Sequence, residues 1–583
     1  MVFCNFPRAV AYLALCLSLQ AAALSFTGPV QSLSDISITE LTQLLDSGTV
    51  TSRDLVDLYS DRIAEVNAEL NAVIEIDVDT ALHVAETLDR DRSNGVLRGP
   101  LHGIPILVKD NYATTGGFNE SLKTGAGSVC LAAGSRPRED ATVVAKLRAA
   151  GAIILGKTNL AEFSGARGHH VPQGWSARGG QTYGAYVRGQ TACGSSSGSG
   201  VAAGLGLAAA ALGTETGGSI TCPASFGNVV GVKPTVGLTS RFGVVPVTPR
   251  QDTAGPLARS VADAALLLEV MAGRDVERDN YTAAQPWDSP PRYTEALNAS
   301  ALRGKRIGVM WYEQGIEFGM NYWANKKQIR RLFDAALDDL RGAGAELVDV
   351  PFGDHGGADK GLFNIHVPMR NGGDYMLPDL KEALARYYDN MAPDDNADEA
   401  STAIQNHTQL LACLREDPRE RSAEYSLEIM AAIAEEDEPL GPAGGAEAWA
   451  AYVNVSTATG SLLRGPLQEQ NLEGLVMYMD LAIVLASAPG LPIVTVPMGG
   501  LGDDARVVYE GEGNDDYNLP RVITGAPGMP QGLSFVDEKW TEMDLVGFAY
   551  AYEQASQRRW TLAPWVKMES DLDNWTGDRI GEL

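Results

Sequence analysis

Apolar and polar residues along the chain switch between helical and strand-like spacing. From Ile38 to Asp77 the spacing predicts two amphipathic helices and then a strand over Val73–Ile76, and the second helix begins at the capping pattern Thr51-Ser52-Arg53-Asp54. The other predicted helices are at 80–92, 142–150 and 260–271, and the other predicted strands are at 105–108, 153–155, 229–232, 244–247, 305–310 and 492–497. This alternation favours a layered α/β fold.

Two longer stretches add to this picture. The run from Gly198 to Leu212 is apolar on all sides, so we predict a helix buried in a large core. Residues about 310–470 have a mainly helical pattern, and the strand-like pattern returns at 492–497. We therefore predict one domain over 25–583, with a helical insertion at about 310–470.

The first 24 residues have the parts of a secretory signal peptide. Met1 to Arg8 carries one basic side chain, Ala9 to Leu24 is uncharged and mostly apolar, and three alanines precede a polar chain. The alternative is a membrane anchor, but this apolar run is shorter than the roughly 20 residues of a spanning helix. We expect cleavage and secretion, or retention in a lumen of the secretory pathway. The apolar stretch at 481–496 is broken by prolines, and we interpret it as buried loop and strand.

Charge and composition limit the partners. The net charge of −28 disfavours nucleic acid and anionic membranes. Four cysteines beyond the leader permit disulfides without fixing a pairing: Cys130, Cys193, Cys222 and Cys413. The candidate glycosylation sites are Asn119, Asn280, Asn298, Asn406, Asn454 and Asn574. No C-x-x-C pair is present, and adjacent His169 and His170 cannot both face one site on a strand, so we predict no metal.

Three segments carry candidate chemistry. Lys109 ends a buried strand pattern, where desolvation would lower its pKa and suit it to act as a base; the alternative is a structural lysine. The segment 194–198 (GSSSG) precedes a buried helix and would place hydroxyls at a helix N-terminus, unless it is a flexible linker. In the third segment, Gly217 and Gly218 before Ser219 would turn backbone N–H groups toward one point, as in an oxyanion hole, or form an ordinary turn.

Together, these segments resemble the amidase-signature family. Cys193 to Gly198 is similar to the family's GG-S-S-GG, Gly213 to Ile220 to its G-T-D-x-GG-S-I, and Gly103 to Asn111 to its lysine-bearing strand. The spacing of 24 residues from Ser195 to Ser219 also fits. Flanking segments at 231–235, 240–246, 252–256 and 488–498 are similar as well, whereas residues about 275–470 have little pattern that matches.

The resemblance implies a three-layer α/β/α fold with a large central mixed β-sheet and a Ser–Ser–Lys triad. Neutral Lys109 would draw a proton through Ser195, held by a cis peptide bond, from the nucleophile Ser219. Ser196 would support the network by hydrogen bonding. The backbone N–H groups implied for the oxyanion hole are those of Thr216, Gly217, Gly218 and Ser219. The implied reaction is hydrolysis of a small-molecule amide through an acyl-enzyme, without a cofactor, by a monomer or homodimer.

The chain departs from the family pattern at several positions near these residues. Cys193 takes the place of the first glycine, Ser197 that of a glycine in the second pair, and Glu215 that of an aspartate. Thr221-Cys222 stands where many members carry arginine. These departures affect the support of the loop and the shape of the acyl pocket, but they remove no member of the triad.

Three other interpretations use the same sequence. The pattern G-x-S-x-G would make Ser196 the nucleophile of an esterase elbow, with a histidine such as His355, His366 or His407 downstream. A glutamine-dependent amidotransferase subunit is disfavoured by the leader, the sequons and the acidity. A catalytically silent binding protein is disfavoured by retention of the triad. The substrate stays open, and we expect pocket residues from 275–470 and from the loops near Gly125 and Gly174.

Overall fold

The computed structural model of the chain describes residues 32–115, 122–133, 135–169, 171–311, 324–351, 375–393, 404–435, 445–510 and 522–572. The predicted leader lies outside these ranges. So do the candidate glycosylation sites Asn119 and Asn574, and the histidines His170, His355 and His366.

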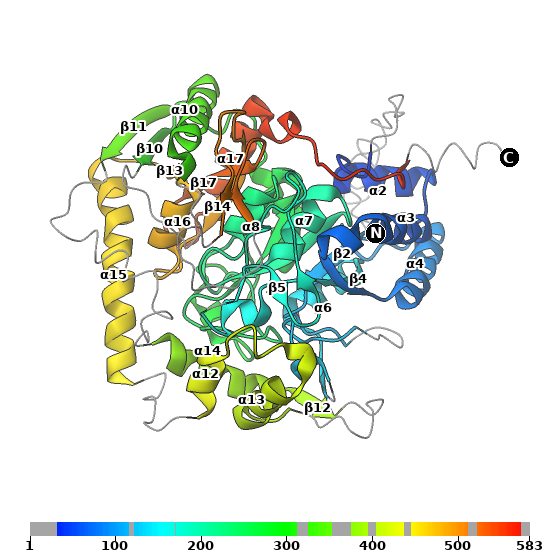
Figure 1. The fold of residues 1–583 in the computed structure, drawn as a ribbon. Coiled ribbons are helices and arrows are strands. Elements are labelled where there is room, and N and C mark those ends of the chain that lie inside the picture. The colour runs from blue at the N-terminus through cyan, green and yellow to red at the C-terminus, as the bar shows by residue number, and fades with distance from the viewer. Residues whose placement is uncertain are drawn as a thin grey trace, which may run out of the picture.

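Eleven strands form one mixed sheet, in the order β1-β4-β2-β7-β9-β8-β14-β17-β13-β10-β11. They are β1 Val73–Ile76, β2 Pro105–Lys109, β4 Ile153–Thr158, β7 Ala210–Glu215, β8 Val230–Lys233, β9 Thr253–Ala258, β10 Arg306–Trp311, β11 Glu346–Pro351, β13 Leu475–Tyr478, β14 Ile493–Gly500 and β17 Pro530–Val536. β2 is parallel to both β4 and β7, and β10 is parallel to both β11 and β13. Helices cover the sheet (Figure 1), and the predicted three-layer fold is confirmed.

The helices in chain order are α2 Ile38–Ser47, α3 Ser52–Leu70, α4 Val78–Ser93, α5 Val129–Ala132, α6 Thr142–Ala149, α7 Ser197–Leu205, α8 Thr221–Phe226, α9 Val261–Met271, α10 Lys326–Gly342, α12 Met376–Asp389, α13 His407–Glu416, α14 Glu428–Ala434, α15 Ala446–Glu469, α16 Met479–Ala486 and α17 Glu542–Ser556. The predicted cap of α3 is present. Thr51 Oγ1 accepts from the Asp54 N–H at 3.1 Å, and Asp54 Oδ2 accepts from the Thr51 N–H at 2.9 Å.

Short strand pairs lie outside the main sheet. β3 (Ser135–Pro137) pairs with β12 (Met391–Pro393), and β5 (Trp175–Ser176) pairs with β6 (Gly180–Gln181). β15 (Val508–Tyr509) pairs with β16 (Ile523–Gly525). The β3–β12 pair joins the helical part of the chain to the segment just before α6.

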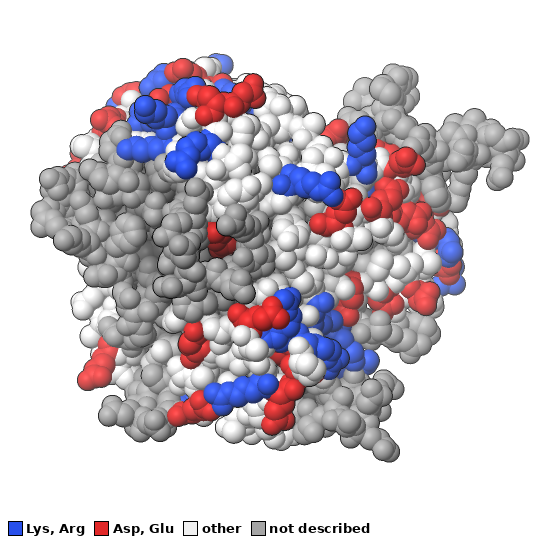
Figure 2. Space-filling view, viewed as in Figure 1, with Lys and Arg blue, Asp and Glu red and all other residues white. Residues whose placement is uncertain are grey.

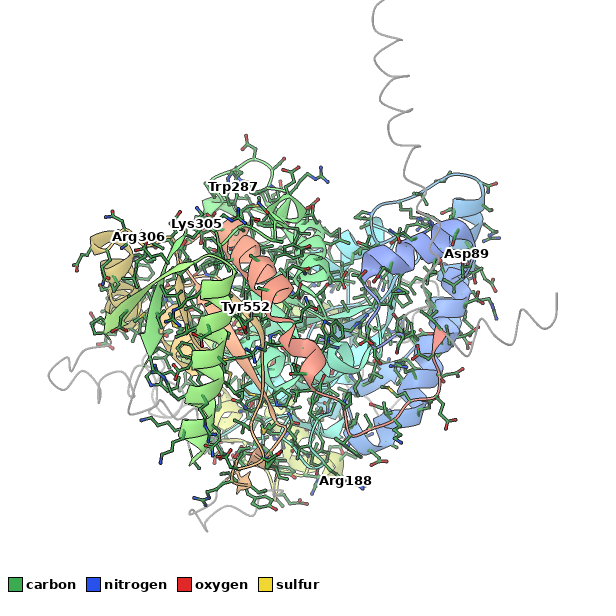
Figure 3. The ribbon with its side chains drawn as sticks, turned by 90° about the horizontal axis from the view of Figure 1, so that it is seen from above. Asp89, Arg188, Trp287, Lys305, Arg306 and Tyr552 are labelled. Atoms are coloured by element: carbon green, nitrogen blue, oxygen red, sulfur yellow. A yellow bond between two sulfur atoms is a disulfide. The ribbon has the colours of Figure 1, made fainter. Side chains whose placement is uncertain are left out.

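The last long helix, α17, packs on the sheet. Tyr552 of α17 lies near the centre of the view in Figure 3, while Asp89 of α4 lies toward the right-hand edge of the molecule. The Tyr552 ring meets the Phe535 ring of β17 edge-on at 6.2 Å, and its hydroxyl donates to the Pro497 carbonyl of β14 at 3.4 Å. Asp89 instead accepts from the Ser52 N–H at 2.8 Å and so ties α4 to the start of α3.

Helices α12, α13 and α14 lie together at the lower edge of Figure 1, and α15 stands along its left edge. These helices fall in the predicted helical insertion, although β11 in the same part of the chain adds a strand to the main sheet. A disulfide between Cys413 of α13 and Cys130 of α5 ties the helices to the core, with the Cα atoms 5.9 Å apart.

A fully buried ion triad strengthens the same attachment. Arg167 Nη1 contacts Glu162 and lies 2.9 Å from Glu420 Oε2, and its Nη2 donates to the Glu420 carbonyl at 2.6 Å. Burial raises the pKa of Glu162 well above its usual range, and the charge of Glu420 adds to this. One guanidinium therefore contacts two buried carboxyl groups, so loss of Arg167 would leave both without this donor.

Three predicted elements differ from the structure. The helix predicted from Gly198 to Leu212 ends at Leu205, and residues 210–215 form β7 instead. Gly206 ends the helix in the left-handed conformation (φ 64°), and its N–H donates to the Ala202 and Ala203 carbonyls. A uniformly apolar run has no periodicity that separates a buried helix from a buried strand.

The second and third differences also involve short apolar segments. Residues 244–247 form no strand, because Val244 makes only an isolated bridge with Tyr112. The apolar stretch at 481–496 is partly helical, since α16 reaches Ala486 before β14 begins at Ile493.

The charged side chains are mixed on the surface. On the face shown in Figure 2, Lys and Arg are interspersed with Asp and Glu and with uncharged residues. Within the described ranges, no helix is both long enough and apolar enough to cross a membrane.

Candidate active site

The candidate residues meet at one edge of the sheet. Lys109 is the last residue of β2, and Thr214 and Glu215 end the adjacent parallel strand β7. Carboxyl ends of parallel strands open to the same edge, which is where α/β folds place their sites. Ser195 lies just before α7, and Ser219 lies just before α8, so the two helices bring both serines to this edge.

Lys109 is fully buried among hydroxyl and carbonyl oxygens. Its Nζ lies 2.8 Å from Ser195 Oγ, 2.8 Å from Thr214 Oγ1 and 3.3 Å from the Thr214 carbonyl. Burial lowers the pKa of Lys109 to about 7, although the charges of Asp252 and Glu215 act in the opposite direction. A substantial fraction of this lysine is therefore neutral near pH 7.

The neutral amine can satisfy these three partners with its lone pair toward Ser195. It has two N–H donors and one lone pair, and the Thr214 carbonyl can only accept. When the second N–H goes to Thr214 Oγ1, the lone pair faces Ser195 Oγ at 2.8 Å. The Ser195 hydroxyl then donates to Lys109, which is the direction a proton relay requires.

Ser195 and Ser196 belong to a loop held on several sides. The Gly194–Ser195 peptide is cis, as the family resemblance implies. The Ser195 carbonyl accepts from the Ala161 N–H at 3.0 Å, and the Ser196 N–H donates to the Ser219 carbonyl at 3.1 Å. Ser196 Oγ donates to the Thr214 carbonyl at 3.1 Å and accepts from the Thr214 N–H at 3.2 Å. The Ser196 side chain therefore ties the loop to β7.

Helix α7 is closely packed at its first turn and well capped at its far end. A Cβ on Gly198 would meet the Ala72 carbonyl oxygen at 2.0 Å, so only glycine lets the helix approach β1 and β4 this closely. At the far end, three buried arginines donate to the last carbonyls of the helix. These donors are Arg62 to Leu205, Arg559 to Gly204 and Arg259 to Ala203.

Glu215 holds the turn around Ser219. Its Oε1 accepts from the Gly218 N–H at 2.8 Å, and its Oε2 accepts from the N–H groups of Ile220 at 2.7 Å and Thr221 at 2.8 Å. The Glu215 side chain is buried, with 1% of the residue exposed. Three charge-assisted hydrogen bonds thus fix the backbone on both sides of Ser219, which is itself 8% exposed.

The four N–H groups predicted for an oxyanion hole differ in their partners. The Gly218 N–H is already bonded to Glu215. For the N–H groups of Thr216, Gly217 and Ser219, we find no acceptor among the described residues. Thr216 is braced by its neighbours, since its Oγ1 donates to Asp252 Oδ1 at 2.6 Å.

The two loops expected beside the pocket lie next to the end of β2 and the start of α7. The Gly127 N–H, in the loop near Gly125, donates to Asp110 Oδ2 at 2.8 Å, and Asp110 directly follows Lys109. A Cβ on Gly174 would stand 3.0 Å from Ser197 Oγ, at the start of α7. A cavity of about 350 Å³ near Asp252 is lined by residues of the 241–252 and 278–281 loops and of α12.

Sequence reasoning missed two features of the site. It gave no role to Thr214, whose hydroxyl accepts from Lys109 and from Asn111 Nδ2 at 2.9 Å. It also left the cysteine pairing open, whereas the structure pairs Cys193 with Cys222 across the two serine loops. The sequence contained an indication of this pairing, because both cysteines stand at or beside positions that depart from the family pattern.

No group of three or more His, Cys, Asp or Glu side chains that could hold a metal ion occurs within the described ranges. Of the three histidines considered for an esterase elbow, only His407 lies within the described ranges, and it belongs to α13. Its Nε2 lies 3.0 Å from the Lys381 carbonyl, and its Nδ1 lies 3.4 Å from the Tyr388 hydroxyl.

Comparison with known proteins matches this geometry to a family. The sequence profile of the family described as Amidase matches residues 54–546, which is most of the chain. The chain belongs to the amidase-signature family. A putative amidase of Arthroderma benhamiae is 37% identical over 526 residues, which is 90% of this chain and 82% of the relative. A probable amidase of Arabidopsis thaliana is 32% identical, covering 93% of this chain and 94% of the relative.

Solved structures agree with this assignment. The native peptide amidase of Stenotrophomonas maltophilia superposes with a TM-score of 0.74 at 34% identity, covering 90% of this chain and 97% of that one. The relatives also include a glutamyl-tRNA(Gln) amidotransferase component of a Synechococcus strain, 31% identical over 89% of this chain and 97% of the relative. This amidase-family chain is an enzyme that hydrolyses carboxylic amide C–N bonds.

Glu215→Gln tests the role of the carboxylate in this turn. The amide would turn an N–H donor toward backbone donors, so we expect the free energy of unfolding to fall by about 1.5–3 kcal/mol and kcat to fall as well. Denaturant unfolding followed by circular dichroism measures the first effect. Glu215→Asp is the matched control, because it keeps the charge and should lose less. An unchanged midpoint and kcat in Glu215→Gln would show that these bonds do not hold the turn.

Proposed function

We propose that Lys109, Ser195 and Ser219 form the catalytic triad of this amidase. The proposal rests on the 2.8 Å contact between Lys109 Nζ and Ser195 Oγ, two buried side chains. Burial keeps the amine partly neutral, and a neutral amine is able to accept a proton. The backbone bond from Ser196 to Ser219 brings the second serine loop against the first.

In the proposed first step, Ser219 Oγ attacks the amide carbonyl carbon. The Ser219 proton passes to Ser195, and the Ser195 proton passes to the lone pair of Lys109. As the tetrahedral intermediate collapses, the C–N bond breaks and the proton returns through Ser195 to the leaving nitrogen. Water then attacks the acyl-enzyme through the same relay. The products are a carboxylic acid and ammonia or an amine.

The proposed oxyanion hole uses the N–H groups of the turn before α8. Those of Thr216, Gly217 and Ser219 have no acceptor in the described part of the chain, and the Gly218 N–H would share its bond with Glu215. Each such donor contributes roughly 10²–10³ to the rate in other hydrolases. The Glu215 carboxylate fixes this turn in advance, so little reorganisation is needed when negative charge develops on the carbonyl oxygen.

The esterase elbow at Ser196 has less support. Within the described ranges, Ser196 Oγ bonds to the backbone of Thr214, and His407 bonds to Lys381 and Tyr388 in the helical insertion. A component of an amidotransferase remains the second candidate, because one such relative covers 89% of this chain. The signal-like leader, the sequons and the net charge of −28 favour a free amidase acting on small amides.

Peptide amides are the first substrates to test, because the solved peptide amidase is 34% identical to this chain. A panel of N-acetyl dipeptide amides, aryl amides and long-chain primary acyl amides separates the substrate classes. Fastest turnover of the dipeptide amides supports this choice. Turnover of glutamine only in the presence of a partner chain would favour the amidotransferase alternative.

Alanine substitution at the three serines distinguishes their roles. We expect Ser219→Ala to abolish hydrolysis and labelling by a fluorophosphonate probe, and Ser195→Ala to lower kcat by at least about 10²-fold, since the relay is lost. Ser196→Ala should cost less, because Ser196 supports the loop without moving a proton. Initial rates and gel-based labelling measure these effects. Loss of labelling in Ser196→Ala but not in Ser219→Ala would contradict the assignment.

The pH profile tests Lys109. Below its pKa the lysine is protonated and cannot accept a proton, so kcat/KM should fall about tenfold per pH unit below about 7 and level off above it. The Asp252 carboxylate favours the charged lysine, so Asp252→Asn should move this limb to lower pH. A flat profile between about pH 5 and pH 8 would exclude Lys109 as the base.

We further propose that the enzyme enters the secretory pathway. Support comes from the leader, from two disulfides and from exposed sequon asparagines. Asn280, Asn298, Asn406 and Asn454 are exposed. When the chain is expressed in a eukaryotic secretory host, we expect an endoglycosidase to increase its gel mobility and N-terminal sequencing to begin after the leader. A chain that retains Met1 and shows no mobility change would contradict this proposal.

A further inference from the structure

A disulfide joins the two loops that carry the paired serines. Cys193 directly precedes the cis Gly194–Ser195 peptide, and Cys222 is the second residue of α8, three positions after Ser219. The two Cα atoms are 5.8 Å apart, and each cysteine is 2% exposed. This cross-link therefore lies inside the protein, next to the reacting groups, and not on its surface.

The disulfide and one hydrogen bond close a small ring around the serines. Residues 193–196 form one side and residues 219–222 form the other. The disulfide joins one end, and the Ser196 N–H donates to the Ser219 carbonyl at 3.1 Å at the other end. Ser195 lies between the two connections on the first side. A change in the separation of Ser195 and Ser219 would therefore strain or break one of them.

The backbone at Cys193 also depends on its connections. Its φ of 57° lies in the left-handed region, which disfavours a residue with a Cβ, and the family pattern has glycine at this position. Neighbouring groups hold it there: the Ser197 hydroxyl donates to the Cys193 carbonyl at 2.5 Å, and the Cys193 N–H donates to Thr191 Oγ1 at 3.1 Å. A cysteine that replaces a conformationally better suited glycine is best explained by the bond it makes.

We propose that the Cys193–Cys222 disulfide is a positioning element of the catalytic site, holding the Ser195 loop and the Ser219 turn at the spacing that proton relay needs. This role rests on the triad proposed above. Reaction between groups held by a protein is sensitive to their separation, and a misplacement of about 1 Å can cost roughly 10²-fold in rate. Neither cysteine contacts the substrate in this account, since both act through the backbone of the serine loops.

The chain offers a matched control in its other described disulfide. Cys130 and Cys413 are 283 residues apart in sequence, against 29 for Cys193 and Cys222, and they tie α13 to α5. Loss of the Cys130–Cys413 disulfide should lower Tm at least as much as loss of the Cys193–Cys222 disulfide. The longer loop that it closes has more conformational entropy in the unfolded chain. If both disulfides only stabilise the fold, removal of either one would leave kcat unchanged.

The experiment compares four proteins on the N-acetyl dipeptide amide with the fastest turnover: wild type, Cys193→Ala/Cys222→Ala, Cys193→Gly/Cys222→Ala, and Cys130→Ala/Cys413→Ala. We expect kcat of the first double variant to fall at least about tenfold with little change in KM. The glycine variant should recover part of kcat, because glycine adopts a positive φ freely. The Cys130/Cys413 variant should keep wild-type kcat although its Tm falls.

Two outcomes would overturn the positioning role. One is a kcat of Cys193→Ala/Cys222→Ala equal to that of the Cys130/Cys413 variant. The other is a wild-type kcat in the glycine variant, which carries the test alone if the alanine variant does not fold. Ser219→Ala separates this result from failure of the triad. If Ser219→Ala is inactive while the cysteine variants keep full kcat, only the positioning role fails; if Ser219→Ala is active, the triad itself fails.

Discussion

The Lys109 amine is fully buried at the ends of two parallel strands, and this burial determines the chemistry of the site. Lys109 ends β2 with its Nζ enclosed by Thr214 and Ser195, and water does not solvate its charge there. Desolvation then outweighs the attraction of Asp252 and Glu215, so the pKa falls to about 7. An exposed lysine at the same position in the sequence would stay protonated near pH 7 and would have no lone pair to offer.

The surrounding structure keeps the partners of Lys109 in place. Helix α7 approaches β1 and β4 closely at Gly198, and arginines satisfy its last carbonyls, so the helix that follows Ser195 is fixed at both ends. The turn before α8 is held by Glu215 from within. The loop before α7 and the turn before α8 are joined near the serines by the Ser196–Ser219 backbone hydrogen bond and by the Cys193–Cys222 disulfide. We therefore propose that this disulfide acts on the local geometry of the two serines.

Much of the fold and of the chemistry could be predicted from the sequence. The capping pattern at Thr51 locates α3, and the strand pattern before Lys109 locates the buried lysine correctly. The run from Gly198 to Leu212 predicts one helix and misses β7, because a wholly apolar segment has no periodicity. The role of Thr214 follows from β7 lying beside β2, a neighbourhood that no local pattern encodes. The pairing of Cys193 with Cys222 likewise needs the two loops to be placed in space.

In the mechanism we propose, Ser219 is activated through Ser195 by Lys109 and attacks the carbonyl carbon. Mass spectrometry of peptides from enzyme treated with a fluorophosphonate tests it most directly, because the adduct marks the attacking atom. We expect a single adduct on Ser219, formed faster at about pH 8 than at about pH 6 and lost in Lys109→Met. An adduct on Ser196, or an adduct on Ser219 whose rate is unchanged in Lys109→Met, would contradict it.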